Sequence, residues 1–370
     1  MRSGVETVRR SRDNARVTIS DLSQALSLTK GTISRALNGY PDISEATRIR
    51  VIRAAQAMGY RPLSHAQAIR TGRSQSLALV IHLAEPDAYR PFLAEFLAGL
   101  TQAASAEGWT ITIATADTEA DSLRLMRDLV QERKADGFIL PRVHRDDPRI
   151  AALAALDTPF ICYGRPKDAE RMSFFDIDSE AAMSEAVGKL AALGHRRIGY
   201  IGSAQSYAFS HHRHAGYRAG LALAGMDPAP ELVEAAVSRE ESVAAAAALL
   251  RLARPPTAIL CATDVLASGV YDAAAAAGLE IGADLSVIGY DNAPEAQAMW
   301  PRLATFAVDN RAAGAALGRM LIARITEPEH PPSQMILPAE FRPGGSIGQP
   351  ARTPEQLAQH LARRREGMTF

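Results

Sequence analysis

The chain has 370 residues, of which 47% are hydrophobic and 22% are charged. These values are typical of a globular protein of two or three domains and exclude an intrinsically disordered or fibrous chain. No apolar run reaches the roughly 18–20 residues that a membrane-spanning helix needs, and no apolar segment follows the arginines of residues 1–16. The sequence therefore predicts neither a membrane protein nor a secreted one, and we expect a cytoplasmic location.

Basic and acidic residues are unevenly distributed, although the formal net charge is zero. Residues 1–73 contain 13 Lys and Arg against 5 Asp and Glu, which leaves 28 basic and 36 acidic residues, of the 41 of each kind, for residues 74–370. This asymmetry indicates that a polyanion binds at one end of the chain only. The two cysteines, Cys162 and Cys261, lie in apolar runs without zinc-ligand spacing, so we expect no disulfide, no metal site and no cofactor.

Three short helices are predicted in the basic segment. Residues 18–21 form an N-capping pattern for the first helix, and residues 27–29 interrupt the apolar spacing for a tight turn. A second short helix follows and ends near Gly39, and a third begins after Ser44 and ends before Gly59. Two helices joined by such a turn, with a third that completes a small core, predict a helix-turn-helix.

Residues 17–72 resemble the DNA-binding head and hinge of the lactose-repressor/galactose-repressor family of bacterial regulators. The resemblance is carried by Thr-Ile-Ser-Arg-Ala-Leu-Asn at 32–38, by Ser44, Thr47 and Arg48 at the start of the third helix, by Gly-Tyr-Arg-Pro at 59–62, and by Ala66 and Ile69 in the short helix-capable linker at 63–71. It implies that the second helix enters the major groove, and that the hinge folds on the DNA and inserts an apolar side chain into the minor groove. The DNA-binding residues that it implies are Thr18, Thr29, Lys30, Gly31, Thr32, Ser34, Arg35, Asn38, Ala66 and Ile69.

Gly31 departs from the family pattern, because a base-reading side chain often stands at this position. Direct readout would then depend on Lys30, Arg35 and Thr32, with Ile69 as the apolar wedge that kinks the DNA. The alternative is a three-helix packing module with a solvated charged face. We favour DNA binding because the motif, the charge and the hinge agree.

Residues 76–343 alternate short apolar runs with helix-forming stretches rich in Ala and Leu. The predicted strands are 77–83, 109–115, 137–140, 160–163, 173–177, 197–201, 258–261 and 286–290, and the predicted helices are 92–106, 120–132, 180–193, 214–224, 242–252, 264–277 and 310–325. Such alternation is typical of parallel sheets with crossover helices, and this many strands indicate two α/β lobes with a cleft between them.

The predicted fold class is thus an all-α helix-turn-helix head followed by a two-lobed α/β body. We expect a disordered basic tail at 1–16, the DNA-binding domain at 17–62 and the hinge at 63–75. The body is expected to form an effector-binding and dimerisation domain at 76–343, and residues 344–370 a C-terminal tail.

The family resemblance extends over the body, through motifs such as those at 193–202 and 286–292. It implies a sensor domain similar in fold to periplasmic sugar-binding proteins, with a small-molecule effector held between the lobes. Arg213 and Asp291 match residues that contact the effector, and a guanidinium and a carboxylate can each bind two sugar hydroxyls. Thr263 and Asn310 lie near further positions at which the family contacts its effector, and Phe92 and Tyr163 are candidate aromatic residues to cover the apolar face of a sugar ring. The expected effector-binding residues are Phe92, Tyr163, Arg213, Thr263, Asp291 and Asn310.

Other roles are open for several of these residues. Arg213 could form a surface ion pair and Asp291 could cap a turn, while Phe92 and Tyr163 could simply pack in the core. Asp264 is interpreted as a helix N-cap rather than a ligand group, because it precedes an Ala-rich helix.

Other classes of site and of protein are less well supported. His211, His212 and His214 are interpreted as part of a solvated loop, because no second ligand cluster accompanies them. We find no phosphate-binding glycine loop and no nucleophile elbow, so an enzyme is not expected. The strongest alternative, a solute-binding protein for transport, would need an export signal in place of the basic segment.

The sequence therefore predicts a transcriptional regulator that binds a pseudo-palindromic DNA operator as a homodimer and responds to a sugar. Among such regulators we favour a repressor. The segment from Thr353 onward begins like a capped helix but has too few heptads for a tetramerising coiled coil. Effector binding is expected to close the lobes and to change the free-energy cost of folding the hinge on the operator.

Overall fold

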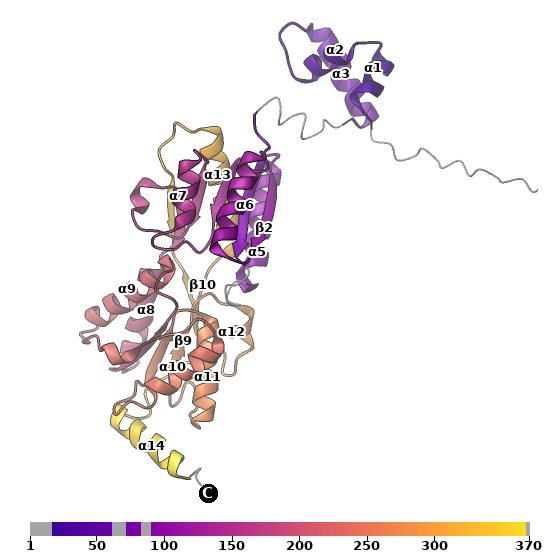
Figure 1. Ribbon diagram of the computed structural model, residues 1–370. Helices are drawn as coiled ribbons and strands as arrows, with labels where there is room; N and C mark the ends of the chain where they lie inside the picture. Colours follow the sequence, from indigo (N-terminus) through magenta and orange to yellow (C-terminus); the bar gives the residue numbers. More distant parts are fainter. Residues whose placement is uncertain (1–16, 61–71, 83–89, 368–370) are drawn as a thin grey trace, which may run out of the picture. The chain divides into compact units, whose positions relative to one another are not determined.

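The structure, a computed structural model, describes residues 17–60, 72–82 and 90–367, and leaves the side chains of 90–92, 295 and 365–367 undescribed. The chain divides into two compact units, Met1–Ser74 and Gln75–Phe370 (Figure 1). The expected basic tail at 1–16 and most of the expected hinge, with Ala66 and Ile69, lie outside the described residues.

The first unit is a three-helix domain. Its helices are α1 (Ile19–Leu26), α2 (Lys30–Leu37) and α3 (Glu45–Met58). Thr18 and Asp21 cap α1 reciprocally, because the Thr18 hydroxyl accepts from the Asp21 amide and the Asp21 carboxylate accepts from the Thr18 amide at 2.7 Å. The buried core is formed by one apolar face of each helix and consists of Leu22, Ile33, Ala36, Val51 and Ala55. The predicted helix-turn-helix is confirmed.

The first lobe of the second unit is built on a six-stranded parallel sheet in the order β11-β5-β4-β3-β1-β2. Its strands are β1 (Ser76–His82), β2 (Thr110–Ala116), β3 (Gly137–Leu140), β4 (Phe160–Tyr163), β5 (Phe174–Ile177) and β11 (Gln334–Leu337). Leu77 and Leu79 face one core and Ala78 and Val80 face another, so β1 is apolar on both faces, as a covered parallel sheet requires. Helices α5 (Arg90–Ala106) and α13 (Asn310–Thr326) pack together on the first face, and α6 (Glu119–Gln131) and α7 (Pro148–Ala155) lie on the other.

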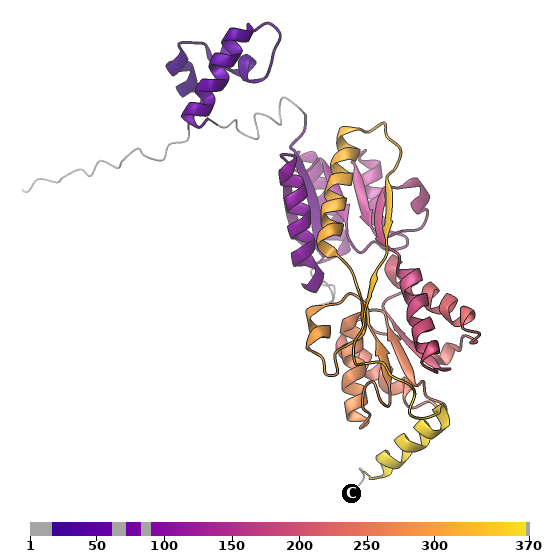
Figure 2. The same cartoon turned by 180° about the vertical axis from the view of Figure 1, so that it is seen from behind.

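The second lobe contains a four-stranded parallel sheet in the order β7-β6-β8-β9. Its strands are β6 (Ile198–Gly202), β7 (Val233–Ala235), β8 (Ala258–Cys261) and β9 (Ser286–Ile288). Helices α8 (Ser179–Ala192) and α9 (Ala208–Leu223) form one packed pair, and α10 (Arg239–Leu249) and α11 (Asp264–Ala276) form another across the sheet (Figure 2).

The chain passes between the two lobes at 177–179, 307–310 and 337–340. Near these crossings β10 (Thr305–Ala307), which follows the short helix α12 (Pro294–Ala298), pairs antiparallel with β12 (Glu340–Arg342). The predicted two-lobed α/β body is confirmed. Among the described residues, no helix is both long and apolar enough to cross a membrane.

Two expectations about local structure are wrong. Helix α9 begins at Ala208 rather than at residue 214, so the three histidines lie on a helix and not in a solvated loop. The segment 344–370 is not separate from the body, because its residues pack on the second lobe. Ser346 is fully buried and its hydroxyl donates to the Val287 carbonyl at 2.6 Å, while Leu357 and Leu361, one turn apart on α14 (Pro354–Gly367), are buried in the core.

Candidate functional site

The surface of α2 carries most of the residues expected to bind DNA. Thr29 caps the helix, since its hydroxyl accepts from the Thr32 amide at 3.1 Å. Lys30, Gly31 and Arg35 are exposed, and Ser34 is half-buried. None of the eight expected residues on this unit that the structure describes is buried: Thr18, Thr29, Lys30, Gly31, Thr32, Ser34, Arg35 and Asn38. They form an accessible polar surface over the length of α2 and the N-cap of α1, and groove binding requires such access.

Arg35 and Asn38 also have partners within the head. Arg35 pairs with Asp42 at 2.6 Å and lies over the Tyr40 ring, with its guanidinium carbon 5.4 Å from the ring centre. The Asn38 amide donates to the Ser34 carbonyl at 2.7 Å. Arg35 is therefore engaged within the head, and the side-chain amide of Asn38 closes the end of α2.

Gly31 has no packing role in the head. A Cβ placed on it would meet only the Thr29 hydroxyl, at 3.7 Å, which is an ordinary contact, and its backbone is that of a normal helix. Its lack of a side chain is therefore a property of the outer surface and not a requirement of the fold.

A pocket of about 360 Å³ lies between the two lobes of the body. It is lined by Tyr163 at the end of β4, by Arg213 on α9, by Thr263 after β8, and by Asp291 after β9. Asn310, at the start of α13, completes the set of expected residues that the structure brings together. The side chain of Phe92 lies outside the described part of the chain.

Arg213 is buried and held by acceptors of the second lobe. It donates from Nη1 to the Ala262 carbonyl and from Nη2 to Asp291 Oδ1 at 3.2 Å. Its guanidinium carbon lies 3.7 Å from the centre of the Tyr290 ring and 4.9 Å from that of Phe209. Burial opposes the charge, but Asp291 and Tyr290 raise the pKa of Arg213 above its ordinary value. The interpretation of Arg213 as a surface ion pair is therefore wrong.

Asp291 is held in an uncommon backbone conformation at the pocket wall. Its φ is 108°, which side-chain-bearing residues rarely adopt, and its amide donates to the Phe306 carbonyl at 2.9 Å. Burial raises the pKa of this carboxyl, against the opposing effect of Arg213. Backbone strain that aims a carboxylate into a pocket is typical of ligand sites.

Tyr163 combines the two roles left open for it. Its ring stacks on Phe96 at a centroid distance of 5.7 Å and meets the edge of Phe175 at 5.6 Å, while it also lines the pocket. Packing against two core rings fixes its orientation at the first-lobe wall.

Asp264 is not the helix N-cap that the sequence suggested. Thr263 caps α11, and Asp264 is the first helical residue. Its buried carboxylate accepts from the Ala293 amide at 2.7 Å and from the Thr305 hydroxyl at 2.6 Å. Burial, aided by the nearby Asp291, raises the pKa of Asp264 to about 8. It lines the pocket and joins three segments behind Asp291.

Sequence reasoning missed further pocket residues. Phe209 lies between the guanidinium groups of Arg213 and Arg142, the latter 5.2 Å from its ring centre. It precedes Arg213 by four residues on one helix face, a signal that was hidden because α9 was predicted to begin too late. Asp176 lines the pocket from β5, where a carboxylate inside the apolar run 174–177 could have been noticed as a functional residue.

Comparisons with known proteins agree with both units. Residues 18–63 match the family described as bacterial regulatory proteins, lacI family, and residues 187–347 match a periplasmic binding protein-like domain. The transcriptional regulator AglR of Rhizobium meliloti (strain 1021) is 34% identical over 346 residues, which cover 91% of this chain and 96% of the relative. The regulator CelR of Thermobifida fusca is 30% identical over 326 residues, which cover 87% of this chain and 96% of that protein.

Solved structures show the same architecture. The complex of the regulator CelR with cellobiose superimposes with a TM-score of 0.70 at 28% identity, over 90% of this chain and 100% of that one. The lac repressor dimer bound to operator and the anti-inducer ONPF gives a TM-score of 0.75 at 22% identity, also over 90% and 100% of the two chains, and supports the fold alone.

Proposed function

The chain belongs to the lacI family of bacterial regulatory proteins, and we propose that it is a dimeric repressor whose operator affinity is controlled by a sugar bound between the lobes of its body. As a family member it is a DNA-binding transcriptional regulator and not an enzyme. The observation that carries the finer proposal is the inter-lobe pocket, in which the Arg213 guanidinium and the Asp291 carboxylate are paired at 3.2 Å. The location that fits this role is the cytoplasm.

A sugar suits the chemistry of this pocket. Carboxylates and a planar guanidinium bind vicinal hydroxyls in pairs, and the aromatic wall formed by Tyr163 and Phe209 can cover the apolar face of a pyranose ring. The CelR relative has been solved with cellobiose. We therefore propose that a mono- or disaccharide binds against Tyr163, Arg213, Thr263, Asp291 and Asn310, with Phe92 as a further aromatic contact expected from the sequence.

The proposed DNA surface is the exposed start of α2. Lys30, Thr32 and Arg35 would contact base edges or phosphates, and the other exposed polar residues of the head would fix its position on the backbone. Ala66 and Ile69 keep the role that the family resemblance implies, insertion into the minor groove. Because one short helix reads only a half-site, two copies on a pseudo-palindromic operator are proposed.

The sugar pocket and the DNA surface can be coupled through the relative free energies of two arrangements of the lobes. A sugar that binds one arrangement of the lobes more tightly shifts the chain toward that arrangement, and it can change operator affinity only by that difference in binding free energy. We propose that it acts by changing the cost of ordering the segment between the two units on DNA.

Two measurements test this function on the full chain. A thermal-shift panel of mono- and disaccharides should identify a sugar that raises the melting temperature in a concentration-dependent way, and Arg213→Ala should abolish the shift. Arg218→Ala, on an exposed part of the same helix, is the matched control. A gel shift on the promoter DNA of its own gene should show salt-dependent binding that the same sugar weakens. No DNA shift, or a sugar response that survives Arg213→Ala, would contradict the proposal.

A further inference from the structure

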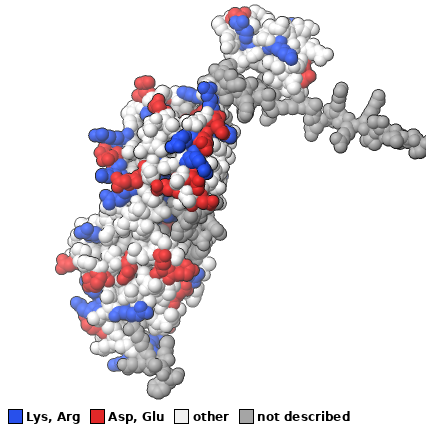
Figure 3. Space-filling model, in the orientation of Figure 1, with Lys and Arg blue, Asp and Glu red and all other residues white. Residues whose placement is uncertain are grey.

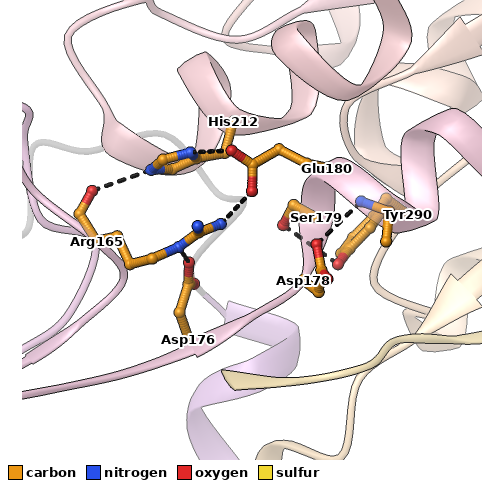
Figure 4. Close-up of polar contacts among 8 residues, drawn as sticks. Arg165, Asp176, Asp178, Ser179, Glu180, His212 and Tyr290 are labelled. Atoms are coloured by element: carbon orange, nitrogen blue, oxygen red, sulfur yellow. Dashed lines mark hydrogen bonds and ion pairs between the residues drawn. The ribbon is translucent and has the colours of Figure 1, made fainter. Parts of the chain in front are cut away.

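Four charged or titratable side chains form a connected network beside the pocket (Figure 4). Arg165 donates from Nε to Asp176 Oδ2 at 2.7 Å, and its Nη2 pairs with Glu180. Glu180 Oε1 lies 2.8 Å from His212 Nδ1, and His212 Nε2 lies 3.1 Å from the carbonyl oxygen of Arg165. The contacts therefore close a ring from Arg165 through Glu180 and His212 back to Arg165, with Asp176 attached to it.

This network joins the two lobes. Asp176 belongs to β5, and Arg165 lies in the loop that follows β4, so both belong to the first lobe. Glu180 lies in the first turn of α8 and His212 lies on α9, and these helices pack on the second-lobe sheet. The Arg165–Glu180 ion pair and the hydrogen bond between His212 and the Arg165 carbonyl are thus contacts between lobes.

Asp176 is the member of the network that faces the pocket. It is the one charged residue of β5, whose four residues are all buried, and it lines the pocket between the lobes together with Arg213 and Asp291 of the second lobe. Burial raises the pKa of this carboxyl, against the opposing effect of Arg165. Among the described residues its side chain bonds to no side chain other than that of Arg165. Burying a carboxylate at the wall of a pocket costs folding free energy, but it provides an acceptor for the hydroxyl groups of a ligand.

The position of His212 determines its protonation. Its two ring nitrogens face a carboxylate and a carbonyl oxygen, which are both acceptors, so both hydrogen bonds form only when both nitrogens carry a proton. Other ionisable groups near it are the Arg165 guanidinium, Asp176 and His211, whose ring centre is 5.7 Å away. The imidazolium is therefore the form that completes the network.

The shifts in pKa agree with this geometry. Burial disfavours the charge on His212, but its hydrogen bonds to Glu180 and to the Arg165 carbonyl raise its pKa above the ordinary 6.5. The hydrogen bond from His212, with help from Arg165, lowers the pKa of Glu180 from 4.5 to about 2. The stabilisation from His212 is complete below pH 6.5 and is lost as the pH rises through its raised pKa, and that from Glu180 is complete above pH 4.5.

We propose that Asp176 is the first-lobe acceptor for the effector, and that Arg165, Glu180 and His212 are positioning residues that hold it and tie it to the second lobe. The inference rests on the proposed function of the pocket and adds to it a dependence of effector affinity on the protonation of His212. Effector affinity should fall as the pH rises, because a neutral His212 gives up one of its two hydrogen bonds, and the connection between the lobes beside Asp176 is weakened.

The first test needs no effector. Histidine labelled with ¹³C at Cε1 in the full chain should show one resonance, absent from His212→Gln, that titrates above pH 6.5. In Glu180→Gln this resonance should titrate closer to the ordinary value, because the carboxylate charge has gone. Titration of His212 at or below pH 6.5 in the wild type would overturn the proposed network.

The second test is calorimetric titration with cellobiose, the sugar in the CelR complex, and with the best sugar of the thermal-shift panel, between pH 6 and pH 9. The wild type should lose roughly fivefold or more in affinity over this range, a coupling of ordinary size between two sites. His212→Gln should show a clearly weaker dependence, because only Asp264, with a pKa raised to about 8, still titrates beside the sugar in this range. Asp176→Asn should bind weakly at every pH. His330→Gln, an exposed histidine paired with Glu327, should keep the wild-type profile.

The outcomes separate this inference from the function on which it rests. If the wild type binds no sugar, both the proposed function and this inference are wrong, even if the pKa of His212 lies above 6.5. Sugar binding that Arg213→Ala abolishes, but that is unchanged by Asp176→Asn or equally pH-dependent in His212→Gln, overturns the positioning network and leaves the proposed function standing.

Discussion

The first unit carries its candidate residues on the open face of α2, whereas the second unit encloses its own in a pocket to which segments as distant in sequence as Tyr163 and Asn310 contribute. On the head, Lys30 and Gly31 have no role in the core, and the ion pair of Arg35 with Asp42 is half-exposed. Such residues can change one at a time with little effect on the fold, which suits a surface that must match a DNA sequence.

The pocket behaves differently because the guanidinium of Arg213 is buried and held by the carboxylate of Asp291 at the pocket wall. Arg213 supports Asp291, and Asp264, behind Asp291, is bonded to two further segments. Removing one member leaves another without a partner in a poorly solvated place. Binding and stability are therefore expected to change together in the body and separately in the head. Charge at the surface does not distinguish the parts so clearly, since Figure 3 shows acidic and basic side chains interspersed on the body.

The largest effect is expected for Arg213→Ala. This change removes the buried guanidinium that holds Asp291, so sugar binding should weaken by about 2–5 kcal/mol, the usual cost of truncating one partner of an interfacial charge pair. Because the side chain of Asp291 is 39% exposed, we expect a value near the lower end of this range. The melting temperature of the body should fall as well, while DNA binding by the head persists in the absence of sugar. Calorimetry, thermal unfolding and gel shifts on one preparation measure all three. Loss of sugar binding with an unchanged melting temperature would show that binding and stability are not coupled in the body.

Leu357→Ala tests whether the C-terminal helix belongs to the body. Leu357 is fully buried, so truncation should destabilise the second unit by about 2–5 kcal/mol. Leu223→Ala is the control, because that leucine is 84% exposed on α9 and its loss should change stability by less than about 0.5 kcal/mol. Equal melting temperatures for the two variants would show that residues 344–370 are dispensable for the fold.

The head could be predicted from sequence almost residue by residue, because its caps, its turn and its exposed face are local patterns around Thr18, Thr29 and Gly31. Most strands and helices of the body could be predicted for the same reason, although α9 was predicted to begin too late and α7 and β7 were not predicted. The sequence did not predict which side chains, distant from one another along the chain, are in contact. The partner of His212 is 32 residues away, and Asp264 bonds to Thr305 across 41 residues. Pairings of this kind depend on how the lobes pack, and no local pattern records them.

Asp264→Asn tests whether a buried pocket carboxyl makes the stability of the second unit depend on pH. Because burial raises the pKa of Asp264 from 3.8 to about 8, the stabilisation of its neutral form is complete below pH 3.8 and is lost as the pH rises through about 8. The wild-type body should therefore lose stability between pH 5 and pH 9, by on the order of 1 kcal/mol per pH unit at most. The asparagine can accept from the Ala293 amide and donate to Thr305, so its curve should be flatter. Asp227→Asn, at an exposed position, should follow the wild type in thermal unfolding across this range.

The smallest effect on stability is expected at Gly31, and its sign is favourable. Since a Cβ there meets only the Thr29 hydroxyl at 3.7 Å, Gly31→Ala should stabilise α2 by about 0.5–1 kcal/mol through its helix propensity. Gly39→Ala is the control, because Gly39 has a φ of 72° and an alanine is strained there. Amide exchange over residues 17–60 of the full chain should show stronger protection of α2 in the first variant and weaker protection in the second. Operator affinity should nevertheless fall in Gly31→Ala, because the added methyl group keeps the α2 backbone away from the DNA. A variant that is both more stable and equally tight on DNA would show that the start of α2 does not approach the groove closely.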